Sequence, residues 1–490
     1  MSKKVKTRFA PSPTGYLHVG GARTALYAYL YAKAKSGEFV LRVEDTDQER
    51  STQESIDMVL NDLKVLGISW DEGPEVGGDN GPYQQSKRLN IYKEHAERLL
   101  QSEKAFHCFC SDELLNEKRE KAKKEGANFH YDGTCRSLTK EQVSKKLEAG
   151  ETATVRFKVD TAEDEYVVQD AVRGEVKFPS DMIGDFIILR SDGMPVYNFC
   201  CVVDDALMGI THVLRAEEHL SNTLRQMMLY QAFQYPLPVF GHVSLILGED
   251  KQKLSKRHGA SSVSEYIEKG FLPSALNNYL TLLGWSSPSE KEILSIEETM
   301  EEFDLDRLKK SPAVFDEAKL LWMNATYIRS MDNIKLWEHL VPFLEKSGLK
   351  PSEEPLWAKE EWRDQALDLF KVRMETMLDG VAPFQFLSEQ NYEINEAAKD
   401  ALSWESSKKV IESWMALIKG SGKSFITVED FGDIQNKVKE QAEVKGKFLF
   451  MPIRAAAIGV ASGADVKELV PLISVETLLK RGAEALNCCS

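Results

Sequence analysis

The sequence has few cysteines, no excess of basic residues and no long apolar run. The chain has seven cysteines in 490 residues, an odd number, and its N-terminal stretch has no apolar signal-peptide core. We therefore expect the protein to be located in the reducing cytoplasm. Lys and Arg number 62 against 77 Asp and Glu, and the formal net charge of −15 disfavours a general nucleic-acid coat or a membrane-surface protein. No run approaches the roughly 18 to 20 apolar residues of a membrane helix, so we expect no membrane partner.

The composition that is present is that of a folded globular protein. Hydrophobic residues make up 42% and charged residues 28%, which excludes a disordered, collagen-like or coiled-coil chain. At about 150 residues per domain, this length predicts about three or four domains.

The first 45 residues predict a βαβ unit. Residues 5–9 alternate in a strand pattern that the prolines of 11–15 end. Good helix formers occupy 22–35, and 39–43 predicts a second strand. Because ligands gather at the carboxyl ends of parallel strands, we expect Glu44 and the turn after the first strand to share one crevice.

The rest of the chain departs from this pattern. A lysine-rich helical stretch at 118–124 and strand-like runs at 154–159 and 185–189 indicate an inserted α+β module. Beyond about residue 324 the periodicity is helical, as in Leu367, Phe370, Met374 and Met377. The predicted fold is multidomain α/β, with a Rossmann-like parallel-sheet domain followed by all-helical domains. Its predicted parts are 1–107 and 196–260 (the two halves of the parallel-sheet domain), 108–195 (the inserted module), 261–325 (a connecting domain) and 326–490 (the helical region).

The first motif that carries chemistry lies between the first strand and the helix. It reads Pro11-Ser12-Pro13-Thr14-Gly15-Tyr16-Leu17-His18-Val19-Gly20-Gly21. Gly20 and Gly21 would let a ligand approach bare backbone at a helix N-terminus, where N–H groups favour phosphate oxygens, and His18 can donate a hydrogen bond to them. The alternative is a glycine-rich turn with no ligand.

The second motif is the basic run Lys253-Leu254-Ser255-Lys256-Arg257. With Lys251 it places three Lys and one Arg within seven residues, which cannot all lie on one packed face. We therefore expect an exposed loop whose charge suits a polyphosphate. The alternative is a solvated run of charges.

Together the two motifs resemble the signatures of class I aminoacyl-tRNA synthetases, with Gly21 in place of the second His and Leu254 in place of Met. Other stretches, along the whole chain, look like bacterial glutamyl-tRNA synthetase. They are Arg8-Phe9-Ala10-Pro11-Ser12-Pro13-Thr14-Gly15, Val43-Glu44-Asp45-Thr46-Asp47, Val202-Val203-Asp204-Asp205, Leu214-Arg215-Ala216-Glu217-Glu218-His219, Lys310-Ser311-Pro312-Ala313-Val314-Phe315 and Leu449-Phe450-Met451-Pro452-Ile453-Arg454.

The resemblance implies an amino-acid site for L-glutamate, lined by Arg8, Ser12, Glu44, Tyr197 and Arg215. A substrate with two carboxylates and one ammonium needs more than one cationic donor and one acidic acceptor. Arg8, Arg215 and Glu44 supply that set, with Glu44 expected at the α-ammonium. Which arginine takes which carboxylate is open at this point.

The resemblance also implies ATP-dependent activation without a nucleophile on the enzyme. The substrate's α-carboxylate would attack the α-phosphorus of ATP, and a hydroxyl of the tRNA's terminal adenosine would then attack the mixed anhydride. We expect His18, Gly20, Gly21, Lys253 and Lys256 to bind ATP. Lys253 and Lys256, with Mg²⁺, would neutralise the leaving pyrophosphate.

The resemblance further implies a zinc site. Cys108, Cys110, Tyr131 and Cys135 look like the zinc-binding insert of some members of this family, with His130 as an alternative fourth ligand. The competing interpretation is three buried free cysteines. Elsewhere, the Cys200-Cys201 pair is expected in a buried strand and the Cys488-Cys489 pair in a loose tail.

The implied partner is tRNA(Glu), contacted at its acceptor end by the inserted module and at its anticodon by the helical region. Phosphate contacts are local, so basic stretches such as 118–124 suffice despite the negative net charge, although a solvated helix face is the alternative there. A monomer is the family's usual state. Whether tRNA(Gln) is also charged stays open.

Three other functions fit these residues less well. Glutaminyl-tRNA synthetase would not call for paired arginines, and a non-catalytic tRNA-binding paralogue would not need both signature motifs. A related nucleotidyltransferase without an RNA substrate would have no use for the helical C-terminal third.

Overall fold

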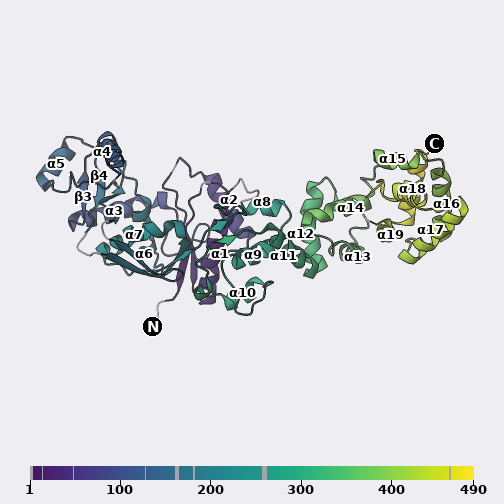
Figure 1. The fold of residues 1–490 in the computed structure, drawn as a ribbon, viewed down its shortest axis with the longest axis horizontal. Coiled ribbons are helices and arrows are strands. Elements are labelled where there is room, and N and C mark those ends of the chain that lie inside the picture. The colour runs from purple at the N-terminus through teal and green to yellow at the C-terminus, as the bar shows by residue number, and fades with distance from the viewer. Residues whose placement is uncertain are drawn as a thin grey trace. The chain divides into compact units, whose positions relative to one another are not determined.

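The computed structural model describes the chain except residues 1–3, 14, 48, 127–128, 161–164, 180–181, 256–261, 463–464 and 490. The chain divides into two compact units, residues 1–267 with 273–317 and residues 268–272 with 318–490. Strands occur in the first unit, and the described residues of the second unit form helices but no strand (Figure 1). The predicted fold class is confirmed.

A four-stranded parallel sheet in the order β2-β1-β8-β9 forms the centre of the first unit. Its strands are β1 (Lys6–Phe9), β2 (Glu38–Leu41), β8 (His212–Ala216) and β9 (Val239–Val243). Because β1 and β2 pair in parallel across one helix, the predicted βαβ unit is confirmed. The last two strands enter the sheet from more than 160 residues further along the chain.

Helix α1 (Val19–Ala34) joins β1 to β2 and is buried along most of its length. It contacts β1, β2 and β8 and, from the sequence after the last strand of the sheet, α9 (Pro273–Leu282) and α10 (Ile296–Glu302). Burial on several sides explains why alanines recur in it, since bulky side chains would not fit.

The inserted region carries two small antiparallel sheets. One contains β3 (Ala105–Cys108), β4 (Thr154–Phe157) and β7 (Phe186–Leu189). The other is a hairpin of β5 (Glu165–Asp170) and β6 (Gly174–Pro179). The helical stretch expected at 118–124 lies in α4 (Asp112–Lys124), which has no buried residue.

The remaining elements of the first unit surround these sheets. They are α2 (Gln53–Val65), α3 (Leu89–Gln101), α5 (Lys140–Glu148), α6 (Tyr197–Leu207), α7 (Leu220–Phe233), α8 (Val263–Glu268) and the strand pair β10 (Ile246–Leu247) and β11 (Ala313–Val314). The Cys200-Cys201 pair is buried, but it lies in α6 and not in the expected strand. A short apolar run fits a buried helix as well as a buried strand, and periodicity alone did not separate them.

The second unit is helical. Its helices are α11 (Glu317–Ser330), α12 (Asn333–Lys346), α13 (Glu360–Phe370), α14 (Val381–Leu387), α15 (Glu396–Leu402), α16 (Ser407–Gly420), α17 (Val428–Ala442), α18 (Lys447–Ile458), α19 (Val466–Leu469) and α20 (Val475–Leu486). Helix α13 ends at Phe370, so Met374 and Met377 do not continue it as their spacing suggested, although both are buried.

Candidate active site

A cavity of about 490 Å³ opens where the parallel strands β1, β2 and β8 end. Its wall includes every described residue that the sequence predicted to bind the amino acid or the nucleotide. These residues are Arg8, Ser12, His18, Gly20, Gly21, Glu44, Tyr197, Arg215 and Lys253. Lys256 lies outside the described residues. Two motifs more than 230 residues apart in the sequence therefore contribute to one hollow.

The glycine-rich turn reaches this cavity through the start of α1. His18 is the N-cap of α1, and its Nδ1 accepts a hydrogen bond from the backbone N–H of Gly20 at 3.2 Å. The neutral ring then carries its proton on Nε2, so its other edge is a donor. A Cβ at Gly21 would lie 3.1 Å from Leu17 Cδ1, so the glycine lets the first turn of α1 pack closely against the preceding residues.

Residues 256–261, which contain the end of the basic run, lie outside the described part of the chain. The segments before and after them lie near the glycine-rich turn that precedes α1. In the segment before, Lys253 forms an ion pair with Glu218, with 2.5 Å between Nζ and Oε2, and both side chains are well exposed. In the segment after, the backbone N–H of Val263 donates to Leu17 O at 3.0 Å. Asp62 accepts hydrogen bonds from Leu17 N at 2.9 Å and Ser264 Oγ at 2.5 Å, which joins α2 and α8 to the turn.

Buried charged groups contact two residues of the cavity wall, Arg8 and Glu44. Arg8 Nε lies 3.2 Å from Asp205 Oδ1, and Arg42 Nη1 lies 2.6 Å from the same oxygen. Arg42 Nη2 donates to Glu44 Oε1 at 3.0 Å. Burial acts to raise the pKa of Asp205, but Arg8 and Arg42 outweigh it and hold that pKa below its usual value. Asp205 is therefore an ionised carboxylate shared by two arginines.

Glu44 is a buried carboxyl group in the cavity wall. Burial raises its pKa above the usual value, and Arg42 and Arg8 counter part of that effect. A cation that entered the cavity beside Glu44 would favour the ionised form.

Arg215 differs from Arg8 and Arg42 because its partners are uncharged. Its Nη1 donates to Gln226 Oε1 at 2.8 Å, its Nη2 to Thr223 Oγ1 at 2.9 Å and its Nε to His242 Nε2 at 3.0 Å. In the described part of the chain, no carboxylate forms an ion pair with it. It is only 5% exposed, so the cavity holds a nearly buried cation whose charge no protein carboxylate directly balances.

Sequence reasoning did not single out several side chains of the cavity wall. His219 Nδ1 lies 3.2 Å from Tyr197 Oη, and burial, together with Arg215, lowers the pKa of His219 to about 4. Glu218 was not assigned a role either, although both residues stand in a stretch that supported the resemblance. Their position directly after β8 was the available signal, because residues that follow parallel strands face the crevice.

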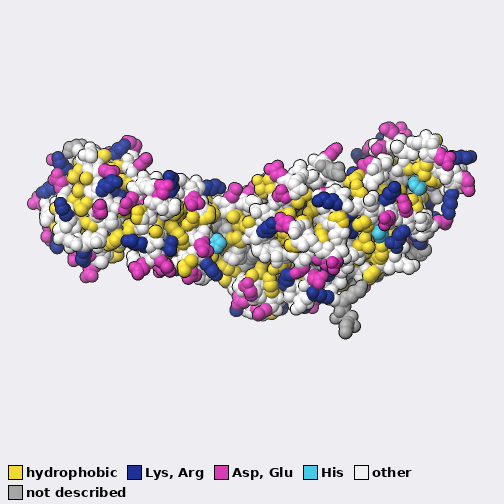
Figure 2. Space-filling view, turned by 180° about the vertical axis from the view of Figure 1, so that it is seen from behind, with side chains coloured by type: hydrophobic (Ala, Val, Ile, Leu, Met, Phe, Trp, Pro, Cys, Tyr) yellow, Lys and Arg dark blue, Asp and Glu magenta, His cyan; other side chains and the backbone are white. Residues whose placement is uncertain are grey.

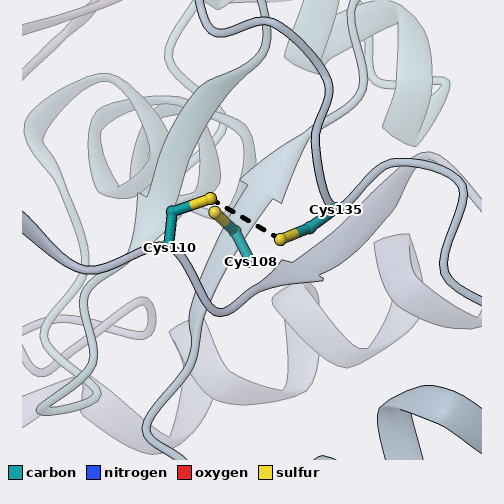
Figure 3. A group of neighbouring side chains, drawn as sticks. All are labelled: Cys108, Cys110 and Cys135. Atoms are coloured by element: carbon teal, nitrogen blue, oxygen red, sulfur yellow. Dashed lines mark hydrogen bonds between the residues drawn. The ribbon is translucent and has the colours of Figure 1, made fainter. Parts of the chain in front are cut away.

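The three cysteines of the inserted region form a second cluster of reactive groups. Their sulfur atoms all lie within 4.8 Å of one another, and Figure 3 shows the side chains pointing together. Tyr131 Oη lies 3.3 Å from Cys108 Sγ and 3.6 Å from Cys110 Sγ, and it accepts the backbone N–H of Cys135 at 2.9 Å. His130 is exposed and does not belong to the cluster. The donor set can hold a metal ion, and soft thiolates suit zinc.

Protonation differs within this cluster. Burial acts to raise the pKa of Cys108, but hydrogen bonds from Tyr131 and Arg156 help to lower it to about 7. Burial raises the pKa of Cys110 to about 11. The guanidinium of Arg156 also lies 4.2 Å from the centre of the Tyr131 ring.

Comparison with known proteins assigns the chain to a family. Residues 4–322 match the catalytic domain of class I tRNA synthetases (E and Q), and residues 335–486 match an anticodon binding domain. The chain belongs to the class I tRNA synthetases of this E and Q type. The predicted family is therefore confirmed.

Relatives of this synthetase family match the chain over nearly its full length. The glutamate–tRNA ligase of Bdellovibrio bacteriovorus is 49% identical over 99% of both chains, and that of Carboxydothermus hydrogenoformans is 44% identical over 96% and 97%. Among solved structures, a glutamate tRNA ligase from Elizabethkingia meningosepticum in complex with its amino acid is 32% identical, with a TM-score of 0.84 and 99% coverage of both chains. Among the described residues of this synthetase, no helix is long and apolar enough to cross a bilayer.

The shared carboxylate gives a first testable prediction. Replacing Asp205→Asn leaves Arg8 buried without an ion-pair partner among the described residues, and the free energy of unfolding should fall by about 3 kcal/mol or more. Chemical denaturation of the two proteins measures this difference.

A matched control is Glu75→Gln, which weakens the exposed ion pair with Lys64 and should change the free energy of unfolding by less than about 1 kcal/mol. Equal losses for the two variants would contradict the role given to Asp205.

Proposed function

We propose that this chain is a glutamate–tRNA ligase, which activates L-glutamate with ATP and transfers it to the 3′-terminal adenosine of tRNA(Glu). The observation that carries the proposal is the single cavity in which Arg8, Arg215 and Glu44 lie beside the His18 turn and Lys253. Cationic groups for two carboxylates, an acidic group for an ammonium and donors for a polyphosphate thus meet in one place.

Arg215 takes the side-chain carboxylate of glutamate in this proposal. Arg8 already shares Asp205, whereas the partners of Arg215 are all uncharged, so a substrate carboxylate supplies the missing countercharge. A glutamine side chain would leave this nearly buried cation uncompensated. The acidic substrate is therefore favoured by the balance of charge as well as by shape.

Glu44 and Arg8 bind the amino-acid end. The α-ammonium lies against Glu44, whose pKa falls towards its usual range when a cation is beside it. Arg8 and Ser12 are the candidate partners of the α-carboxylate, at the end of the same strand. This holds the α-carboxylate oxygen for attack on the α-phosphorus of ATP.

The chain stabilises charge during the reaction and supplies no nucleophile. His18, with its proton on Nε2, donates to phosphate oxygens, and Gly20 and Gly21 leave the start of α1 open to them. Lys253 exchanges Glu218 for the leaving pyrophosphate, and Lys256 acts with it. Mg²⁺, when bound with ATP, offsets part of the same negative charge.

The tRNA spans the inserted module and the second unit in this proposal. Residues 335–486 match an anticodon binding domain, which is the support for placing the anticodon there. Basic and acidic side chains are interspersed over the face seen in Figure 2, so on this face phosphate contacts would be local patches and not one broad field. We propose the cytoplasm as the protein's location, because ATP and tRNA are available there as substrates.

Aminoacylation assays test the proposal. Purified protein, ATP and L-glutamate should charge isolated tRNA(Glu), and pyrophosphate exchange with tRNA present should depend on L-glutamate and not on L-glutamine. The same assay with isolated tRNA(Gln) shows whether that tRNA is a second substrate. Failure to exchange pyrophosphate with L-glutamate in the presence of tRNA(Glu) would contradict the proposal.

We further propose that Cys108, Cys110, Cys135 and Tyr131 bind one structural zinc ion. Three sulfur atoms and a phenol oxygen already converge, and four ligands of this type complete a tetrahedral site. The ion would fix the loop that carries Cys135 to the end of β3.

Elemental analysis of protein purified without chelator should find one zinc per chain, and Cys135→Ser should reduce it severalfold. His130→Ala is the matched control and should keep the full amount, because His130 lies outside the cluster. Protein without stoichiometric zinc would remove the site.

A further inference from the structure

A chain of three buried side chains leads from the inserted hairpin to the cavity. Asp170 Oδ2 lies 2.5 Å from His242 Nδ1, and His242 Nε2 accepts from Arg215 Nε at 3.0 Å. All three residues are at most 5% exposed, and Arg215 lines the cavity. Neither Asp170 nor His242 does, so these two can act on a substrate only through Arg215.

Backbone pairing places the three side chains of Asp170, His242 and Arg215 next to one another. Arg215 and His242 are direct register partners in the parallel pair β8 and β9. Asp170 ends β5, and the next residue donates its N–H to Phe240 O of β9 at 2.7 Å. Gly241, between Phe240 and His242, leaves room for Leu214 of β8, because a Cβ there would lie 2.6 Å from Leu214 Cδ2.

The hydrogen bonds determine where the imidazole proton lies. The Nε of an arginine is always a donor, so His242 Nε2 must be the acceptor and the single ring proton must be on Nδ1, facing Asp170. Burial lowers the pKa of His242, which favours this neutral form. Asp170 Oδ1 also accepts from the backbone N–H groups of Val172 at 2.9 Å and Arg173 at 2.8 Å, which fixes the carboxylate.

The arrangement also keeps the negative charge of Asp170 away from the guanidinium of Arg215. A carboxylate in place of the imidazole would pair with Arg215 and compete with an acidic ligand for it. The neutral ring instead orients the guanidinium and leaves its charge available. The other charged group that faces His242 is Arg173, whose Nε donates to His242 O at 3.3 Å and which pairs with Glu217.

We propose that Asp170 and His242 are positioning residues for substrate selection: Asp170 fixes the tautomer of His242, and His242 holds Arg215 for the side-chain carboxylate of the amino-acid substrate. The inserted hairpin thereby contributes to amino-acid recognition in the parallel-sheet domain. This inference rests on the proposed glutamate–tRNA ligase activity.

The test is Asp170→Asn made in two backgrounds, the natural chain and His242→Leu. In the natural chain, the asparagine oxygen keeps the hydrogen bonds from the backbone N–H groups of the turn, while its amide N–H faces Nδ1. The imidazole proton then moves to Nε2, where it opposes the Nε–H of Arg215 and turns towards Thr223 Oγ1, which lies 3.2 Å from Nε2. A leucine at 242 has no polar side-chain atom that could pass the change at residue 170 to Arg215, so the Asp170 substitution no longer changes what Arg215 meets.

We expect Asp170→Asn to raise the KM for L-glutamate in pyrophosphate exchange about tenfold or more in the natural chain, and by less than about threefold in the His242→Leu background. The KM for ATP should stay unchanged in all variants. A role limited to capping the hairpin turn would instead give the same factor in both backgrounds.

Three results would overturn the proposal: equal effects of Asp170→Asn in the two backgrounds, an unchanged KM for L-glutamate in the natural background, or a parallel rise in the KM for ATP. His95→Gln is the matched control. His95 is a buried histidine of α3 that bonds Tyr235 Oη at 2.8 Å and does not line the cavity, so its variant should keep the natural KM.

A spectroscopic measurement keeps the proposal testable if a variant does not fold. In ¹⁵N spectra of the natural protein, the side chain of His242, assigned through bonds to its backbone, should show the neutral form with the proton on Nδ1. A proton on Nε2 would overturn the proposal. The natural protein tests the proposed function separately, since absence of glutamate-dependent exchange there contradicts that activity and leaves the tautomer measurement unaffected.

Discussion

The distribution of carboxylates among three buried arginines determines the character of the cavity. Asp205 serves both Arg8 and Arg42, and Glu44 and Asp204 provide two further carboxylates for Arg42. Arg215 has uncharged partners. Because a buried charge without a countercharge is costly, this one position of the cavity favours an acidic ligand.

The fold explains how such a cation is tolerated. Arg215 makes hydrogen bonds from all three of its nitrogens, and its guanidinium lies 5.3 Å from the centre of the Phe240 ring. These contacts come from β9 and α7, next to β8 in the sheet and in the chain. The cation is thus oriented before any ligand arrives, and a ligand need not spend binding energy on ordering it.

Local sequence patterns predicted the elements that first define the cavity. Alternation at 5–9, helix formers at 22–35 and the strand at 39–43 were enough for the βαβ unit, because each depends on neighbouring residues. The same kind of reasoning misplaced Cys200-Cys201 in a strand and continued a helix past Phe370. In both places tertiary packing, and not local spacing, decides where the apolar side chains are buried.

In the candidate site too, local motifs could be recognised in the sequence, whereas contacts made by tertiary packing could not. The motifs around His18 and Lys253 could be found from their residue types, and the resemblance added Arg8, Glu44, Tyr197 and Arg215. The partners of Arg215 could not be found in this way. Asp170 and His242 are 72 residues apart, and each stands near the end of a strand with no distinctive local pattern. Only the register of β8 with β9 and the approach of the hairpin bring them to Arg215.

The most direct test of the central claim is the ratio of kcat/KM for L-glutamate to that for L-glutamine, measured by pyrophosphate exchange with tRNA present, before and after Arg215→Gln. The account predicts that the ratio falls about a hundredfold or more, because activation of glutamate loses its cation while glutamine loses little. A variant that keeps the natural ratio, or loses activity with both amino acids to the same extent, would contradict it.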